Sequence, residues 1–160
     1  MKVAVISFVF PIAEPYYRQT LESIYDQTDK DFDTIIIDDG LDIDDLPDYI
    51  RQIHNNNNLT PLKLREIIFN KLIEEGYDLV VSIDSDDTMS NDRVALVKQK
   101  YLEFPDEGFY YSKLNYMSDP GKPFFLLPDD VTDISAILLH NFVGLSHTSL
   151  NLKVLREKNV

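Results

Sequence analysis

DLVVSIDSDD, residues 78–87, contains a short apolar run that ends in a cluster of aspartates. Its β-branched residues favour a strand, and the near absence of polar residues indicates a strand buried on both faces. FDTIIIDDG, residues 32–40, repeats this arrangement, with three isoleucines followed by Asp38 and Asp39. Two buried strands that end in carboxylates predict a parallel sheet with a polar edge.

The segments around these two strands alternate between strand and helix signals. Residues 3–10 form a third apolar run that stops at Pro11, and helical spacing of apolar residues predicts a helix over 14–27. A further helix is expected to start at Thr60 and Pro61, to bury Leu64, Ile68 and Leu72, and to end at Gly76. Another is expected over 91–104, with Val94, Val97, Tyr101 and Phe104 on one side. The remaining expected elements are strands over 109–116, 124–127 and 145–150, helices over 132–140 and 151–158, and a loop over 41–58 that contains one short helix and one short strand. This order predicts an α/β protein with a mainly parallel sheet and helices on both faces, formed as a single domain over 1–160.

Composition narrows the classes of partner. The 160 residues include 28 acidic and 15 basic ones, for a formal net charge of −13, so no basic surface is expected to bind nucleic acid or anionic lipid. There is no cysteine, which excludes disulfides and thiolate chemistry. No run approaches the roughly 20 apolar residues of a membrane span. We interpret residues 3–10 as a strand rather than a signal peptide and expect a cytoplasmic protein.

The aspartates at the strand ends are candidates for a metal site. Asp84 and Asp86 stand at alternate positions where the chain leaves its strand, so both carboxylates can reach one hard cation such as Mg²⁺ or Mn²⁺. Such a cation allows an acidic protein to bind an anionic nucleotide diphosphate. The simpler alternative is that these aspartates cap helices or begin polar turns. Their place at the ends of buried strands favours a functional role.

Four blocks of sequence, VAVISFVFP, TLESIYDQ, FDTIIIDDG and DLVVSIDSDDTMSNDR, follow one another in this order. Together they resemble the successive blocks of the family 2 glycosyltransferases, and the resemblance spans about residues 2–160. It implies a GT-A type, Rossmann-like fold and a metal-dependent, inverting transfer of a sugar from a nucleotide-diphosphate donor to a hydroxyl of a saccharide or other acceptor. The residues that it assigns to the donor are Ser7, Phe8, Pro11, Glu14, Asp39, Gly40, Arg65 and Asp84. The Mn²⁺ or Mg²⁺ ion is assigned to Asp84 and Asp86, with Asp86 the better direct ligand.

The sequence departs from the family pattern in two places. Leu41 follows the DDG block where the family usually has serine. The family's later Glu-Asp pair, which supplies the general base, is not found, so the chain resembles a short form without the acceptor-side segment. Asp129 and Asp130 are candidate substitutes, with Asp130 the weak candidate base, although a polar turn before a helix is the simpler interpretation. His140 and His147 could complete a metal site, but a structural role is favoured for both.

Aromatic residues gather in the last third of the chain. Phe109, Tyr110, Tyr111, Tyr116, Phe124 and Phe125 could stack on an acceptor sugar, but we expect most of them in the core.

Two other functions fit part of the sequence. DSDDT, residues 84–88, satisfies the signature of haloacid-dehalogenase-type phosphatases, in which Asp84 would be the nucleophile. That signature normally opens its domain, whereas here organised α/β sequence precedes it. The third hypothesis is a non-catalytic module that binds a nucleotide sugar and lacks the general base.

Overall fold

The computed structural model describes residues 1–124 and 144–158, which fold around a six-stranded sheet with the strand order β3-β2-β1-β4-β8-β5. The strands are β1 (Val3–Val9), β2 (Asp33–Asp38), β3 (Arg51–His54), β4 (Leu79–Asp84), β5 (Phe109–Tyr111) and β8 (Thr148–Asn151). Parallel pairing joins β3, β2, β1 and β4, while β8 runs antiparallel to both β4 and β5. The mainly parallel sheet predicted from the sequence is therefore confirmed.

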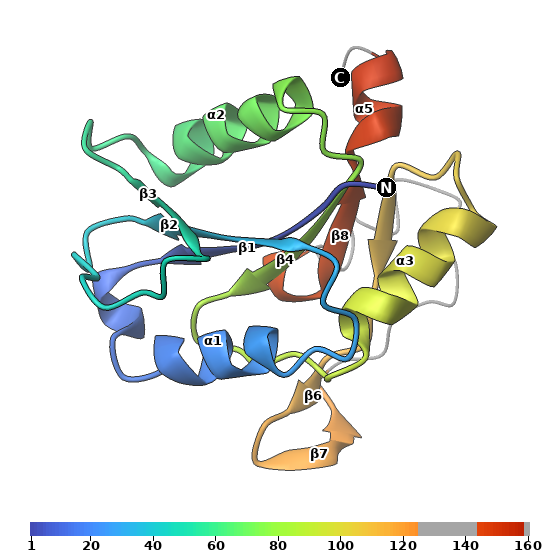
Figure 1. Ribbon diagram of the computed structural model, residues 1–160. Helices are drawn as coiled ribbons and strands as arrows, with labels where there is room; N and C mark the ends of the chain where they lie inside the picture. Colours follow the sequence, from blue (N-terminus) through green and yellow to red (C-terminus); the bar gives the residue numbers. More distant parts are fainter. Residues whose placement is uncertain (125–143, 159–160) are drawn as a thin grey trace.

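Helices cover both faces of this sheet (Figure 1). The helices α2 (Pro61–Glu74) and α5 (Leu152–Lys158) lie on one face, and α1 (Tyr17–Tyr25) and α3 (Arg93–Glu103) lie on the other. This is the layered arrangement that a parallel sheet needs, since its strands are apolar on both sides. Burial is complete along β1, where every residue is buried.

Two apolar clusters hold the layers together. On one face Leu64, Ile68 and Leu72 of α2 pack with Ile6 and Ile35 of the sheet, as their helical spacing predicts. The cluster on the other face joins the sheet to α1 and α3 through Val3, Val5, Leu79, Val81, Ile83, Ile24, Val94 and Val97. The start of α2 also follows the prediction, because the Thr60 side chain accepts a hydrogen bond from the Lys63 amide and Pro61 occupies the first turn.

Several boundaries differ from the predicted ones. The helix expected over 14–27 is shorter than predicted, because α1 covers only Tyr17–Tyr25. A 3₁₀ helix, η1 (Pro11–Ala13), and turns precede it. In the 41–58 loop the expected short strand forms as β3, but the expected helix does not. Asp38 explains this difference, because its buried carboxylate accepts hydrogen bonds from the amides of Leu41, Asp42 and Ile43 and fixes an irregular path.

The last third of the described chain also differs in detail. The strand expected over 109–116 divides into β5 and β6 (Asn115–Tyr116), and β6 pairs with β7 (Asp119–Pro123) in a small separate sheet. The strand expected over 145–150 begins as a 3₁₀ helix, η2 (Leu145–His147), before β8. The helix predicted over 151–158 forms as α5. Residues 125–127 and the helix expected over 132–140 lie outside the described residues.

Two predictions of burial are wrong. Phe104 follows the end of α3 and is 46% exposed, although the pattern placed it with the buried side of that helix. The aromatic residues from Phe109 onward do not form a core: Phe109, Tyr110 and Tyr111 are half-buried, while Tyr116 and Phe124 are exposed. Tyr116 and Phe124 instead pack on each other, with ring centroids 5.2 Å apart. Phe125 lies outside the described residues.

Candidate functional site

The carboxyl ends of β2, β1 and β4 meet at one edge of the sheet. In the strand register Val9 of β1 lies opposite Asp38, and Phe8 lies opposite Asp84. Two strand spacings, about 10 Å, therefore separate the acidic ends of β2 and β4. The edge combines the two aspartate clusters that the sequence placed at strand ends.

Asp38 and Asp39 have different roles despite their adjacency. Asp38 is 2% exposed and is used within the fold, as its bonds to the 41–43 amides show. Asp39 is half-exposed, and its amide donates to the Val9 carbonyl oxygen at 2.8 Å. The Asn55 side chain donates to the Asp39 carboxylate at 2.6 Å. Asn55 lies in an asparagine-rich run, so no local pattern distinguished it in the sequence.

The turn after β4 is organised around a serine that lies far away in the sequence. The Ser146 hydroxyl contacts Asp84 Oδ2 at 3.0 Å and bonds Asp87 Oδ2 as well, while its oxygen accepts from the Asp84 amide at 3.0 Å. Burial raises the pKa of Asp84 above its ordinary value, and the Ser146 hydrogen bond opposes this shift. The charges of Asp87 and Asp86 raise that pKa further. Asp84 and Asp87 thus converge, while Asp86 is exposed.

A buried arginine supports the same turn. Arg93, the first residue of α3, is 6% exposed, and its guanidinium donates to the carbonyl oxygens of Ser82, at 2.9 Å, and Ser146. Burial lowers the pKa of Arg93 to about 10, whereas the charges of Asp87 and Asp84 raise it. The side chain is therefore positively charged at neutral pH and offsets part of the charge of the acidic turn. Arg93 was not among the site residues predicted from the sequence.

Polar side chains of α1 and of Gln27, which follows it, hold the backbone after the acidic turn. Thr20 donates to the Asp87 carbonyl oxygen at 2.7 Å, and the Ser23 hydroxyl accepts from the Met89 amide at 3.2 Å. Gln27, 1% exposed, donates to the Ser90 carbonyl oxygen at 2.8 Å and accepts from the Val94 amide at 3.0 Å. The Ser-and-Gln pattern of the TLESIYDQ block therefore has a structural purpose here: it fixes the path of residues 87–94.

Arg65 lies at the same edge. Its guanidinium carbon is 5.5 Å from the ring centroid of Phe8, and its positive charge lowers the pKa of Asp84, as the weakest of the causes that act on that carboxyl. The buried Nε of Arg65 has no hydrogen-bond partner among the described residues. An arginine near a carboxylate cluster but not hydrogen-bonded to it is available for an anionic ligand.

Some of the other predicted donor residues are buried and some are exposed. Ser7 and Phe8 are 1% and 3% exposed, so neither side chain is displayed at the surface. Pro11 and Glu14 are exposed, and Pro11 lies near Gly40, whose φ of +97° suits glycine. Leu41 packs beside the small apolar cluster that contains Val9. Asp129, Asp130 and His140 lie outside the described residues.

The carboxylates fit a hard cation that also uses ligand oxygens. Among residues 1–124 and 144–158 no group of three or more His, Asp or Glu side chains converges to hold a metal alone. Asp84 and Asp87 nevertheless share the single proton of one hydroxyl, which leaves their negative charge largely uncompensated. Mg²⁺-type sites commonly combine one or two carboxylates with phosphate oxygens and water. The donor set suits such a shared site.

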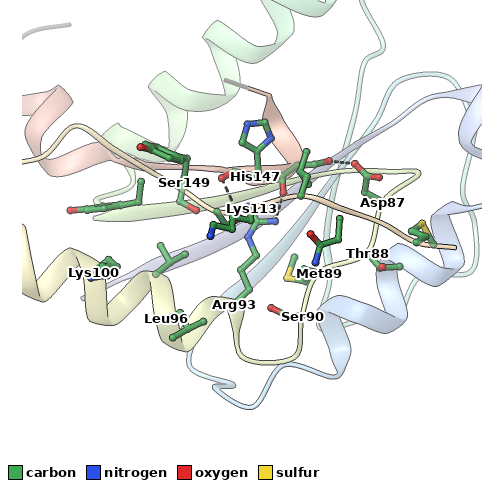
Figure 2. A pocket seen from close by; sticks show the side chains of 18 of the residues that line it. Asp87, Thr88, Met89, Ser90, Arg93, Leu96, Lys100, Lys113, His147 and Ser149 are labelled. Atoms are coloured by element: carbon green, nitrogen blue, oxygen red, sulfur yellow. Dashed lines mark hydrogen bonds between the residues drawn. The ribbon is translucent and has the colours of Figure 1, made fainter. Parts of the chain in front are cut away.

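A cavity of about 660 Å³ begins at this turn and runs between α3, β5 and β8 (Figure 2). Asp87, Arg93 and His147 all line it. His147 is 3% exposed, and its Nε2 accepts from the Gly144 amide at 3.3 Å. Burial lowers the pKa of His147, and the charge of Arg93 lowers it further, so the ring is neutral at pH 7. A neutral ring is compatible with a structural role and with metal binding, so the structural role favoured for His147 stays a prediction.

Known proteins resemble this chain in structure but not closely in sequence. No protein-family model matches it, and no curated protein matches it significantly. A crystal structure of S. aureus TarS 1-349 in complex with UDP-GlcNAc superposes on the whole chain with a TM-score of 0.73 and 15% identity. The chain has the GT-A fold of glycosyltransferases. The mannosyltransferase PcManGT from Pyrobaculum calidifontis, in complex with GDP-Man and Mn²⁺, shares this fold with a TM-score of 0.63 and 15% identity over 98% of the chain.

This chain covers only about half the length of the solved glycosyltransferase structures. The chain spans 48% of the TarS structure and 46% of the PcManGT structure. The GT-A fold extends over the roughly 80 residues before Asp84, which the phosphatase hypothesis left unexplained. Within the described residues, no helix has the length and apolar character that a membrane crossing requires.

Proposed function

We propose that this chain binds a nucleotide-diphosphate sugar at the acidic edge of its sheet and belongs to a glycosyltransferase that transfers the sugar to an acceptor hydroxyl. The observation that supports the proposal is the strand register within a GT-A fold: Asp38, which precedes Asp39, pairs with Val9 of β1, and Asp84 pairs with the adjacent Phe8. In such sheets ligands bind outside the carboxyl ends of the strands. The solved neighbours include complexes with UDP-GlcNAc and with GDP-Man.

The donor would extend across the edge from β2 to β4. Asp39, half-exposed and oriented by Asn55, is suited to accept a hydrogen bond from the base or ribose. Arg65 would bind the diphosphate, since its charge lies near Asp84 without a hydrogen bond to it. Pro11, Glu14 and Gly40 would border the nucleoside, and Ser7 and Phe8 would support that border from beneath.

A divalent cation would join the acidic turn to the diphosphate. Asp84 and Asp86 would provide protein ligands to Mn²⁺ or Mg²⁺, with Asp87 held beside them by Ser146. When bound, the ion stabilises the negative charge that develops on the leaving diphosphate. The complex of PcManGT with GDP-Man and Mn²⁺ supports a divalent ion in this fold. The chain's own contribution is to hold Asp84 and Asp87 through the Ser146 hydroxyl, while Arg93 fixes the backbone at Ser82 and Ser146.

The transfer would invert the configuration of the sugar. The bond from the anomeric carbon to the diphosphate breaks as a bond to the acceptor oxygen forms, and the hydroxyl proton passes to a carboxylate base. Asp130 is the candidate for that base within this sequence. Asp130→Asn should then abolish transfer while UDP binding persists. Equal transfer by this variant would remove Asp130 from the proposal.

The alternative is a module that binds the donor and does not catalyse transfer. Donor hydrolysis distinguishes the two, because a catalytic site slowly transfers the sugar to water. Release of sugar from UDP-GlcNAc or GDP-Man that requires Mn²⁺ would indicate catalysis, and binding without release would indicate a binding module.

Calorimetric titration of UDP and GDP, with and without Mn²⁺, tests the proposal directly. We expect binding of one of them that depends on the metal and that Asp86→Ala removes without a change in melting temperature. Asp92→Ala is the matched control, since Asp92 is an exposed aspartate just before α3 whose side chain makes no capping hydrogen bond. Metal-independent binding, or unchanged binding in Asp86→Ala, would refute the metal site. Phosphatase activity lost in Asp84→Asn would instead support the dehalogenase-type hypothesis.

A further inference from the structure

The cavity beside Asp87 has the opposite charge balance to the chain as a whole. Its described lining contains three basic side chains, Arg93, Lys100 and Lys113, against one carboxylate, Asp87. The protein carries a formal net charge of −13. A positive cavity in a strongly acidic protein attracts anions locally while the rest of the surface repels them. The contrast points to a ligand that carries negative charge.

Lys113 is the exposed cation of this cavity. It pairs with no carboxylate in the part of the chain that the structure describes, whereas Lys100 is engaged by Glu103 at 2.7 Å. The backbone on both sides of Lys113 is fixed. The Ser112 amide donates to the His147 carbonyl oxygen at 2.9 Å, and the Leu114 carbonyl oxygen accepts from the Phe124 amide at 2.8 Å. The fold thus holds at the rim of the cavity a lysine that has no ion pair with any residue of 1–124 or 144–158.

Arg93 adds a fixed positive charge at the floor. Figure 2 shows its side chain extending from α3 toward His147 of η2 and Ser149 of β8, with Asp87 at one end of the same cavity. Its hydrogen bonds go to backbone carbonyl oxygens and not to a carboxylate. The guanidinium charge therefore contributes to the potential inside the cavity.

The same cavity offers flat apolar surface beside the cations. Tyr110, Tyr111 and Tyr116 line it, and the first two are half-buried on or beside β5. The Tyr110 hydroxyl donates to the Phe104 carbonyl oxygen at 2.8 Å, which fixes the orientation of that ring. Aromatic rings with fixed orientation present an apolar face on which a sugar ring can pack. Aromatic and cationic groups together suit a charged saccharide better than a neutral one.

We infer that this cavity binds the acceptor and that the acceptor is an anionic saccharide, with Lys113 contacting its phosphate or carboxylate group. The inference rests on the proposed function, which places the donor diphosphate at Asp84 and leaves the cavity beyond Asp87 for the group that receives the sugar. Lys113 would act as a specificity-determining residue that distinguishes charged from neutral acceptors. A lysine ammonium binds phosphate and carboxylate alike, so a phosphorylated sugar and a sugar acid must be tested separately.

Saturation-transfer NMR with UDP and Mg²⁺ present tests the inference, since Mg²⁺ is diamagnetic. The probes are glucose 6-phosphate, glucuronate and glucose. We expect at least one anionic probe to bind about tenfold more tightly than glucose at low salt, and 0.5 M NaCl to reduce the difference because salt screens exposed charges. The anion that binds better identifies the acceptor's charged group. Equal binding of all three probes, or binding of none, would overturn the inference.

Lys113→Glu should reduce the affinity for the anionic probe to that for glucose. Lys153→Glu is the matched control, because Lys153 is an exposed lysine on α5 away from the cavity. UDP binding in the presence of metal is measured on the same samples. If the unmodified protein does not bind UDP, the result counts against the proposed function. If Lys113→Glu binds UDP normally and binds the anionic probe as tightly as the unmodified protein does, the result counts against this inference alone.

Discussion

Ser146 and Asp84 are 62 residues apart in the chain and are joined by two hydrogen bonds, each 3.0 Å long. A hydroxyl has one proton, so the additional bond from Ser146 to Asp87 means that both carboxylates compete for it. We expect Ser146→Ala to release the acidic turn and weaken metal-dependent UDP binding about tenfold, equivalent to about 1.4 kcal/mol. Calorimetry measures this change. Thr148→Val is the control, because the buried Thr148 hydroxyl has no hydrogen-bond partner among the described residues; equal losses in both variants would contradict the role of Ser146.

Asp84→Asn should abolish metal-dependent UDP binding and raise the stability of the metal-free protein. Burial raises the pKa of Asp84, which means that the folded state disfavours its charged form. For a carboxyl with a raised pKa, stability falls as the pH rises above the unfolded value, so the charge destabilises the fold at neutral pH. Removal of that charge should raise the melting temperature, by roughly 2–4 °C for each kcal/mol gained. A lower melting temperature for Asp84→Asn in thermal unfolding at pH 7 would show that this reasoning is wrong.

Gln27→Ala should weaken nucleotide binding although Gln27 lies beneath the site. Its amide group makes hydrogen bonds with Ser90 and Val94 that hold the chain after the acidic turn. Loss of a buried group that satisfies two backbone partners should cost about 2 kcal/mol or more of unfolding free energy. Urea denaturation and UDP calorimetry measure the two effects. Gln19→Ala, on the exposed side of α1, should change neither.

Glu75→Gln should destabilise the protein at neutral pH but not in acid. Arg51 donates hydrogen bonds to both carboxylate oxygens of Glu75, one of them 2.7 Å long, and holds the pKa of Glu75 below its usual value. The stabilisation is present above the unfolded pKa, near 4.5, and is lost as the pH falls through the lower folded value. Solvent screening limits it to about 1 kcal/mol. Melting curves at pH 7 and pH 3 should differ for this variant but not for Glu74→Gln, and a pH-independent loss would count against the ion pair.

The parts of the fold that depend on local pattern were predictable from the sequence. The strands β1, β2 and β4 are apolar runs of β-branched residues, and α2 has a capping threonine, a proline and a regular apolar stripe. These elements place Asp39 and Asp84 at one edge, which was expected. Arg65, which the family resemblance assigned to the donor, also lies near this edge.

The remaining features depend on contacts between distant segments. Ser146 is 59 residues from Asp87, and no periodicity relates a serine before a short strand to that aspartate. Arg93 and Lys98 are charged residues on the buried side of α3, where hydrophobic pattern alone predicts exposure. Lys98 is buried because Asp29 accepts a hydrogen bond from it at 2.8 Å. Asp38 and Asp39 likewise look equivalent in the sequence, and only tertiary structure assigns the first to the loop and the second to the surface.

The side chains of Thr20, Ser23 and Gln27 make hydrogen bonds to backbone groups of residues 87–94. These bonds do not involve the side chains of Thr88 and Ser90. Thr88 and Ser90 are exposed and border the cavity, while the backbone groups of Asp87, Met89 and Ser90 are hydrogen-bonded to the side chains of Thr20, Ser23 and Gln27. Substitutions at these two positions can therefore alter the wall of the cavity without disturbing the course of the chain. Evolution or engineering could retune acceptor choice there at little cost to folding.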